Sequence, residues 1–485
     1  MTGKQLKNSI LQWAIQGKLV PQDPNDEPAS VLLEKIRAEK ARLIKEGKIK
    51  KDKKESIIYR GEDNSYYEKF TDGKVVCIDE EIPFEVPESW QWERWGNLSY
   101  SIQYGYNAPA EEAGDIRMVR ISDIQDGEVL WATVPFCHIN KSEIDTYLLQ
   151  KDDILFARTG ASVGKTYIYR ELDGLVYYAG FLIRAHVNED NNADFVYQNT
   201  LTEAYYKYIQ ITSQRSGQPG VNAKEYQEFT FFVPDKEEQD KISTFLGEID
   251  TLITLHQRKC DETKTLKKYM LQKMFPQDGK KVPEIRFKGF TDDWEQRKLG
   301  EFGKATGGTS IESEFSEDGV YKVISIGSYS ENSVYNDQGI RAIKSDKTSN
   351  RVLNRNDLTM ILNDKTTSGN IIGRVLLIEE SGIYVYNQRT ERIEINLNEY
   401  DSVFLYEMLN APNIREKIIK QAQGNTQIYV NWTAISLLEY MIPSKEEQAK
   451  IGNYFTILDH IITLHQRKCD ELKEMKKYML QNMFV

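Results

Sequence analysis

The sequence contains no long apolar run. Its mean hydropathy is −0.57, and no stretch approaches the roughly 20 apolar residues that a membrane-spanning helix needs. The first thirty residues do not combine a basic stretch with an apolar one, as a secretory signal would. We therefore expect a cytoplasmic protein with no membrane partner.

Cysteine is also scarce, with four residues in a chain of 485. Cys77, Cys137, Cys260 and Cys469 show no C-x-x-C spacing, and the last two occupy the same position in two copies of a repeated segment. This pattern argues against a disulfide framework and against a zinc site. We expect free thiols and no bound metal.

The chain lacks an excess of positive charge. It has 63 Lys and Arg against 74 Asp and Glu, a formal net charge of −11. Proteins that coat nucleic acid do so by neutralising phosphates with basic side chains, so any contact with DNA has to be local or shared with partners. Residues 1–55 are the exception, with thirteen Lys or Arg against eight Asp or Glu, which fits phosphate contact and equally a solvated helix face.

One long segment is present in two copies. Lys236-Glu237-Glu238-Gln239 precedes nine residues, 254–262, and Lys445-Glu446-Glu447-Gln448 precedes the same nine residues at 463–471. The two histidines in them give a period of 465 − 256 = 209 residues, far longer than the roughly 20 to 50 residues of a solenoid repeat. The sequence therefore predicts a duplicated globular domain, each copy followed by a spacer.

Each spacer carries seam residues at alternating steps of four and three, the pattern of a coiled coil. About 40 residues at about 1.5 Å rise give a helix of roughly 60 Å. The first helix ends at the second unit and the second helix leaves that unit, so paired seams have to run antiparallel, which predicts a pseudo-two-fold arrangement. The seam residues singled out are Leu246, Ile253, His256, Cys260, Phe455, Ile462, His465 and Cys469.

The sequence divides into five predicted parts. Residues 1–55 form an N-terminal helical segment, because Leu6 to Gln12 repeats the pattern of Leu266 to Gln272 and so completes the repeat, although a short amphipathic helix matching by chance is the alternative. The others are globular unit one at 83–232, a central helical spacer at 233–281, globular unit two at 286–440 and a C-terminal helical spacer at 441–485.

The two globular units align through shared landmarks. The offset grows from 204 residues at Trp90 and Trp294 to 209 at Gly164 and Gly373. The five extra residues fall in a loop, near 158–162 in unit one and 363–370 in unit two. Loops that differ on a shared scaffold usually carry binding specificity. Short β-rich runs followed by helical stretches predict a mixed α/β fold for each unit.

Four features of the sequence point to one family. They are the repeated Lys-Glu-Glu-Gln helices, the tandem units, the stretch Ile154 to Lys165 and the opening segment Leu6 to Pro21. Together they resemble the specificity subunit of type I restriction-modification enzymes. The resemblance spans essentially the whole chain. It departs in unit two, where Asn363 to Gly369 replaces the Ala-Arg-Thr-Gly run.

The resemblance implies a non-catalytic subunit with two target recognition domains, each reading one half of a split sequence in double-stranded DNA. The helices would hold the domains apart and seat two adenine-N6 methyltransferase subunits, which two ATP-driven, translocating endonuclease subunits would join. S-adenosylmethionine, ATP and Mg would then be cofactors of those partners, with none bound by this chain.

The candidate DNA-binding residues are polar side chains at loop positions. Major-groove recognition uses forked donors for guanine and amides for adenine, whereas lysines more often position the phosphate backbone. A solvated surface charge or a turn-forming asparagine is the alternative for each. The candidates are Arg158, Lys165, Arg215, Gln218, Asn222 and Lys224 in unit one and Lys365, Asn370, Arg374, Gln427 and Asn431 in unit two.

Two motifs suggest other chemistry. Residues 160–166 resemble a phosphate-binding loop, but such a loop needs four residues between its glycines and only three are present. His256 and Cys260 have a metal-like spacing, which we interpret as a polar pair that fixes helix register. No catalytic residues are predicted. The competing hypotheses are a coiled-coil scaffold that binds proteins through its globular ends, and an enzyme that binds nucleotide at residues 160–166.

Overall fold

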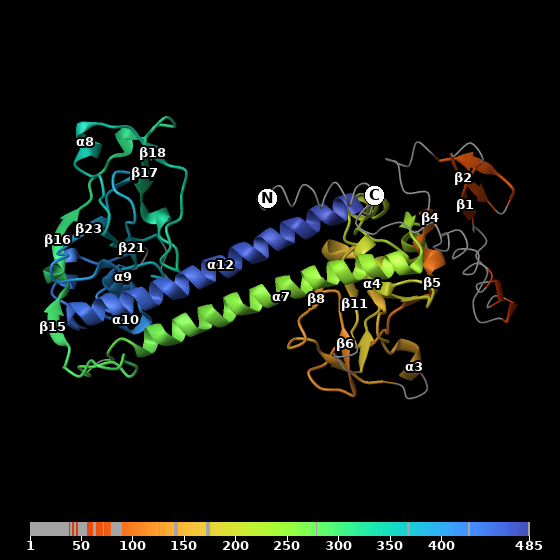
Figure 1. The fold of residues 1–485 in the computed structure, drawn as a ribbon, viewed down its shortest axis with the longest axis horizontal. Helices are drawn as coiled ribbons and strands as arrows, with labels where there is room; N and C mark the ends of the chain where they lie inside the picture. The colour runs from red at the N-terminus through yellow and green to blue at the C-terminus, as the bar shows by residue number, and fades with distance from the viewer. Residues whose placement is uncertain are drawn as a thin grey trace. The chain divides into compact units, whose positions relative to one another are not determined.

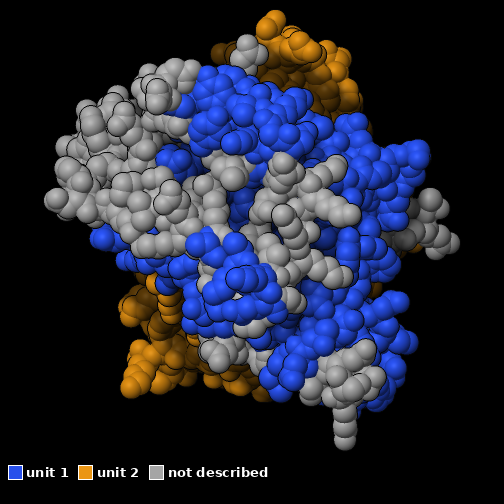
Figure 2. All heavy atoms as spheres, turned by 90° about the vertical axis from the view of Figure 1, so that its right-hand side faces the viewer, with its two compact units in different colours: residues 1–254, 470–485 blue, residues 255–469 orange. Residues whose placement is uncertain are grey.

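The chain forms two compact units, residues 1–254 with 470–485 (unit 1) and residues 255–469 (unit 2), which Figure 2 colours separately. The computed structural model describes residues 56–61, 65–70, 72–78, 90–125, 127–139, 144–170, 175–277, 279–365, 369–424 and 427–483, and a few isolated positions between 38 and 46. The predicted repeat segment at Leu6 to Gln12 lies outside the described residues.

Unit 1 is built on a four-stranded antiparallel sheet in the order β11-β10-β13-β5. Its strand β10 (Ile154–Ala157) is buried at every position, as a short continuous apolar run predicts. A second sheet, β12-β6-β9, pairs β12 with β6 in parallel, and β14 pairs with β4. The bounds are β4 (Gln91–Arg94), β5 (Ser99–Tyr104), β6 (Ile116–Val119), β9 (Phe136–Cys137), β11 (Thr166–Ile168), β12 (Val176–Tyr178), β13 (Leu182–Val187) and β14 (Thr230–Val233).

Unit 1 also carries three smaller features. The strands β1 (Ser56–Arg60), β2 (Tyr66–Phe70) and β3 (Val75–Cys77) form a separate antiparallel sheet, which an ion pair between Glu68 and Arg94 ties to β4. Strand β7 (Ile124–Gln125) pairs antiparallel with β8 (Glu128–Val129). Helix α3 (Ile144–Tyr147) is a single turn.

Unit 2 repeats the strand order of unit 1, with a four-stranded sheet β16-β23-β19-β21 and a three-stranded sheet β18-β17-β22. Its strand β19 (Leu358–Ile361) is buried throughout, like β10. It adds a two-stranded ribbon, β20 with β24, in the loop region predicted to differ. The bounds are β15 (Glu295–Lys298), β16 (Gly303–Gly307), β17 (Tyr321–Ile324), β18 (Arg341–Ala342), β20 (Asn363–Asp364), β21 (Val375–Leu377), β22 (Tyr384–Tyr386), β23 (Thr390–Ile395), β24 (Ile428–Tyr429) and β25 (Glu439–Ile442).

Short helices lie between and after the strands of each unit. Polar N-cap side chains start most of them. Asn192 accepts a hydrogen bond from the Phe195 amide, and Asp401 accepts one from Phe404. The mixed α/β character predicted from the sequence is therefore confirmed. The helices are α4 (Ala193–Asn199), α5 (Glu203–Thr212) and α6 (Ala223–Gln227) in unit 1, and α8 (Asp346–Ser349), α9 (Ser402–Asn410), α10 (Pro412–Ile419) and α11 (Trp432–Ile435) in unit 2.

Two long helices, α7 (Lys236–Lys273) and α12 (Lys445–Met483), contain 38 and 39 residues (Figure 1). In unit 1 the last turns of α12 pack on the first turns of α7, where Met479 and Leu480 join the core that contains Leu246. In unit 2 the first turns of α12 pack near the end of α7, where Phe455 stacks on Phe275. In the described parts of the chain, no helix is both long and apolar enough to cross a membrane.

A buried glutamine ties the start of each long helix to its own unit. The Gln239 side chain accepts a hydrogen bond from the Asn192 amide at 2.9 Å and donates to the Asn191 side chain and the Pro234 carbonyl. Gln448 repeats this, accepting from the Asp401 amide and donating to the carbonyls of Glu399 and Pro443. These contacts explain the glutamine of the repeated Lys-Glu-Glu-Gln segment.

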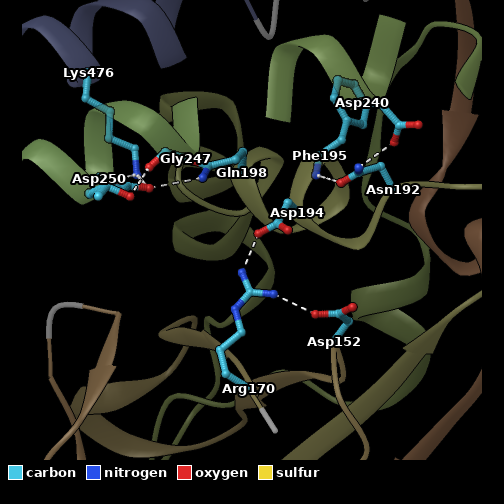
Figure 3. A network of polar contacts seen from close by, with 11 residues as sticks. Asp152, Arg170, Asn192, Asp194, Phe195, Gln198, Asp240, Gly247, Asp250 and Lys476 are labelled. Atoms are coloured by element: carbon cyan, nitrogen blue, oxygen red, sulfur yellow. Dashed lines mark hydrogen bonds and ion pairs between the residues drawn. The ribbon is translucent and has the colours of Figure 1, made fainter. Parts of the chain in front are cut away.

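A lysine links the two long helices within each unit. In unit 1, Lys476 of α12 lies 2.7 Å from the carboxylate of Asp250 of α7, beside Gln198 of α4 (Figure 3). In unit 2, Lys267 of α7 binds Asp459 of α12 at 2.7 Å and Glu407 of α9 at 2.9 Å. The sequence period of 209 residues relates the two lysines and the two aspartates.

We expect Gln239→Ala to destabilise unit 1 by about 2 kcal/mol, because buried groups on the helix and on the loop before α4 lose their partners. Hydrogen exchange at the starts of α4 and α7, together with the melting temperature, measures the effect. The matched control Glu237→Gln removes only an exposed ion pair with Lys241, and its expected effect is below about 0.5 kcal/mol. Equal effects of the two substitutions would contradict this role of Gln239.

Candidate nucleic-acid interface

Three strand ends meet at one edge of the main sheet of unit 1, because neighbouring strands are antiparallel: the end of β5, the end of β10 and the start of β13. Two backbone hydrogen bonds organise the residues there. The Arg158 amide donates to the Phe181 carbonyl, and the Val221 amide donates to the Arg158 carbonyl. We call this region, with its counterpart in unit 2, the strand-end surface.

Arg158 is held over an aromatic ring on this surface. Its guanidinium carbon lies 4.9 Å from the centre of the Tyr104 ring, an arrangement that favours a cation. The Arg158 Nε is buried without a hydrogen-bond partner among the described residues. The Tyr104 hydroxyl is itself fixed by the Ala223 amide. Arg158 is therefore a preorganised donor with unused hydrogen-bonding capacity.

The other candidates in unit 1 divide between this surface and local structural roles. The Gln218 side-chain amide lies against Gly160, two residues after Arg158. Lys165 and Lys224 are exposed. Asn222 caps α6 in a capping box with Glu225. Arg215 pairs with the same Glu225 and with the Thr212 and Gln214 carbonyls.

The same backbone bonds identify the equivalent residues of unit 2. The Leu362 amide donates to the Arg389 carbonyl, and the Val430 amide donates to the Leu362 carbonyl. Leu362 therefore occupies the place of Arg158, and Arg389 that of Phe181. Cross-strand pairing also places Gly307 where unit 1 has Tyr104. The cation thus occupies a different strand end in each unit, and among the described residues of unit 2 no aromatic ring stacks on Arg389.

A cavity of about 250 Å³ opens on the strand-end surface of unit 2. It brings together two predicted residues, Lys365 and Gln427, with residues that sequence analysis did not select. Its lining residues are Glu312, Ser325, Ile326, Lys365, Asn387, Gln388, Arg389 and Gln427. Arg389 has a left-handed backbone with φ of 69°, a conformation that costs a non-glycine residue about 1 kcal/mol and is often found at functional sites.

Glu312 is the carboxylate of this cavity. It accepts hydrogen bonds from the Ser310 hydroxyl, from the side-chain amide of Asn387 at 2.9 Å and from the side-chain amide of Gln388 at 3.0 Å. Those bonds, first from Ser310 and then from Asn387, lower the pKa of Glu312. In the part of the chain that the structure describes, neither Lys365 nor Arg389 forms an ion pair with it. The cavity therefore combines a fixed anion with two cations that form no ion pair with any residue the structure describes.

The remaining candidates in unit 2 contact protein groups. The Asn370 amide donates to Glu331, and Arg374 donates to the Ser333 hydroxyl at 2.9 Å. Asn431 caps α11. The buried Arg415 donates to the carbonyls of residues 369, 370 and 372, so it shapes the loop beside the cavity. DNA contact by these residues stays a prediction.

The seam residues lie along α7 and α12. Leu246 and Phe455 are fully buried, and Ile253 and Ile462 are partly buried. The Nδ1 atoms of His256 and His465 are 2.9 Å apart. Cys260 and Cys469 are buried and form no disulfide within the described residues, and they lie near Gln466 and Gln257 respectively. Within the described ranges, no three His, Cys, Asp or Glu side chains gather as metal ligands.

Sequence reasoning missed Tyr104, Glu312 and Arg389. Tyr104 is separated from Arg158, and Glu312 from Arg389, by tens of positions, and none of the three belongs to a motif. One signal was present, because Gly307 ends β16 and Gly308 follows it, at the level where unit 1 has Tyr104. Glycine in or beside a strand often marks close approach of another group.

The fold is a tandem duplication in which each unit carries one strand-end surface on the same strand order. The sequence profile described as "Type I restriction modification DNA specificity domain" matches residues 106–265 and 291–474. The chain belongs to this family. The resemblance inferred from the sequence is therefore confirmed.

Individual relatives agree. The chain is 34% identical over 255 residues to the type I restriction enzyme EcoAI specificity subunit of Escherichia coli, a match covering 50% of this chain and 39% of that protein. It is 23% identical over 406 residues to the MjaVIII specificity subunit of Methanocaldococcus jannaschii, covering 81% and 92%. A solved S subunit from M. genitalium shares the fold, with a TM-score of 0.55 at 12% identity over 83% of this chain and 98% of that one.

A buried carboxyl beside the cavity gives a pH dependence. Glu391, the second residue of β23, is 6% exposed, and burial raises its pKa to about 7. A raised carboxyl pKa means that the folded state holds the proton more tightly than the unfolded state. The stability of unit 2 should therefore fall as the pH rises from about 4.5 to about 7, and then level off.

We expect Glu391→Gln to match the wild type near pH 4.5 and to be more stable by about 1 to 3 kcal/mol at pH 8, because no charge is buried. Urea unfolding at several pH values measures this. The control Glu394→Gln changes an exposed carboxyl on the same strand and should leave the pH dependence intact. If Glu391→Gln keeps the wild-type dependence of unfolding free energy on pH, another group causes that dependence.

Proposed function

We propose that this chain is the DNA-recognition subunit of a type I restriction-modification complex. Each unit binds one half of an asymmetric bipartite sequence in double-stranded DNA through its strand-end surface. The chain itself is non-catalytic. Family membership supports the general role, and the two strand-end surfaces support the division into two half-sites.

One observation carries the proposal. The same backbone frame presents Arg158, Phe181 and Tyr104 in unit 1 but Leu362, Arg389 and Gly307 in unit 2. Two surfaces with one architecture and different donors are suited to reading different base sequences, because donor and acceptor patterns distinguish base pairs in the major groove. A scaffold that bound two copies of one protein would gain nothing from this difference.

The long helices act as the spacer. We propose that α7 and α12 form an antiparallel coiled coil with pseudo-two-fold symmetry, which holds the recognition units at a fixed separation. Their 38 and 39 residues correspond to about 57 Å of helix. That length is of the order of two turns of DNA, each about 34 Å.

The partners follow from the family. The complex would contain two adenine-N6 methyltransferase subunits seated on the helices and two endonuclease subunits that translocate DNA, in the cytoplasm. S-adenosylmethionine, ATP and Mg would be bound by those subunits. Basic surfaces on the partners would compensate for the net charge of −11 and supply phosphate contacts.

The direct test is co-expression with a cognate methyltransferase, followed by genome-wide mapping of methylated adenines. We expect a split motif with unlike halves and an unread gap of fixed length. Absence of sequence-selective methylation, together with capture of a protein by the isolated units, would favour the protein-binding scaffold. ATP binding by the isolated chain would favour a nucleotide site at residues 160–166.

We expect Arg158→Lys to lower affinity for the cognate sequence by about 1 to 3 kcal/mol and to relax one position of one half-site, because the forked donor is lost. The control Lys224→Ala should weaken binding uniformly across sequences and reduce the salt slope by about one. Binding of duplexes substituted at each position measures both. A uniform loss in Arg158→Lys would assign it to the phosphate backbone.

We expect three heptads inserted after Arg258 and three after Arg467, at equivalent points of the helices, to lengthen the preferred gap by about nine base pairs. Twenty-one residues add about 32 Å of helix, close to one DNA turn, and whole heptads keep the seam in register. Retention of duplexes with different gaps measures this. The same insertion in α7 alone should abolish retention of every duplex. A double insertion that leaves the preferred gap unchanged would contradict the role of the long helices as a spacer.

A further inference from the structure

The cavity of unit 2 holds an unusual combination for a surface that faces DNA. Its carboxylate, Glu312, is fixed by three neighbouring side chains and has no cationic partner among the described residues. Lys365 and Arg389 line the same cavity. A carboxylate at such a place repels phosphates, so it weakens non-specific binding. Its presence calls for a ligand group that donates hydrogen bonds.

We propose that unit 2 reads a C·G base pair through this cavity, with Glu312 accepting from the N4 amine of cytosine and Arg389 donating to O6 and N7 of the paired guanine. The inference rests on the proposed function and extends it to a named base pair. In the major groove a C·G pair presents one donor beside two acceptors. An anion and a forked cation on one cavity match that pattern.

The chemistry of the carboxylate discriminates against the other bases. Thymine presents an acceptor and a methyl group in the major groove, and guanine presents two acceptors, so both repel an ionised carboxylate. Adenine offers an amine, but its N7 acceptor lies beside it and is matched by an amide rather than by an acid. Cytosine presents only a donor. The ionised state favoured by the bonds from Ser310 and Asn387 strengthens this preference.

The geometry suits a fixed reader rather than a mobile surface charge. Asn387 is buried, and its side chain also accepts a hydrogen bond from the Ile311 amide, so it positions Glu312 from the protein side. The left-handed backbone of Arg389 starts the strand that follows. Unit 1 has Phe181 at the Arg389 position and Tyr104 at the Gly307 position. The base pair assigned to this cavity therefore belongs to the half-site of unit 2 alone.

The test uses the complex of this chain with its methyltransferase and measures its affinity for DNA duplexes. One duplex carries the mapped target. In the others, a single cytosine is replaced by a pyrimidin-2-one nucleoside, which lacks the N4 amine. In the wild type, one replacement in one half-site should weaken binding about tenfold, within the range of a single base contact. In Glu312→Gln the same replacement should have less than a twofold effect. Glu314→Gln, a carboxylate outside the cavity, should behave as the wild type.

The outcomes distinguish a failure of the proposed function from a failure of the base-pair assignment. No sequence-selective binding by the wild-type complex would overturn the proposed function and this inference together. Selective binding with no cytosine sensitive to Glu312→Gln would overturn the inference alone. If Glu312→Gln binds too weakly to measure, Arg389→Lys serves as the second variant, and it should abolish discrimination at that same base pair. Relaxation at a different pair, or in the other half-site, would refute the assignment.

Discussion

The structure depends on the attachment of each long helix to the unit that precedes it. A glutamine amide has both a donor and an acceptor, and Gln239 and Gln448 use both while buried. Buried polar groups that are fully satisfied hold one geometry, because any alternative leaves a partner unpaired. The acid before each glutamine adds a second anchor, from Glu238 to Trp90 and from Glu447 to Arg286. The orientation of each helix on its own sheet is thereby fixed.

The two units share one strand order although their sequences differ. The lysine contact between the long helices, in contrast, is not the same in the two units. In unit 1 the aspartate that binds Lys476 lies beside the neutral Gln198. In unit 2 Lys267 lies between two carboxylates, and burial raises the pKa of Glu407. A lysine that binds two carboxylates is a different electrostatic arrangement from a lysine that binds one carboxylate with a neutral amide beside it. Duplication has preserved the position of the contact but not its charge.

The sequence predicted the family, the mixed α/β fold and two long helical segments, because the repeat is nearly unchanged there and heptad spacing is a local signal. It did not predict the strand-end surfaces. The equivalence of Arg158 with Leu362 follows from backbone hydrogen bonds and not from residue type, and drift in the repeat offset hides it in the sequence. Asn222 and Asn431 were selected as polar loop residues, although helix capping uses the same side chains in the same places. Glu312 and Arg389 line one cavity because β16 pairs with β23.

The histidine pair on the long helices has a chemical consequence. The two Nδ1 atoms are 2.9 Å apart and belong to residues with the same neighbours in sequence. A hydrogen bond between two imidazole nitrogens requires a proton on one and a lone pair on the other. Whichever ring donates, one Nδ1 carries the proton and the other presents its lone pair, so His256 and His465 differ in proton position even though their neighbours in sequence are identical.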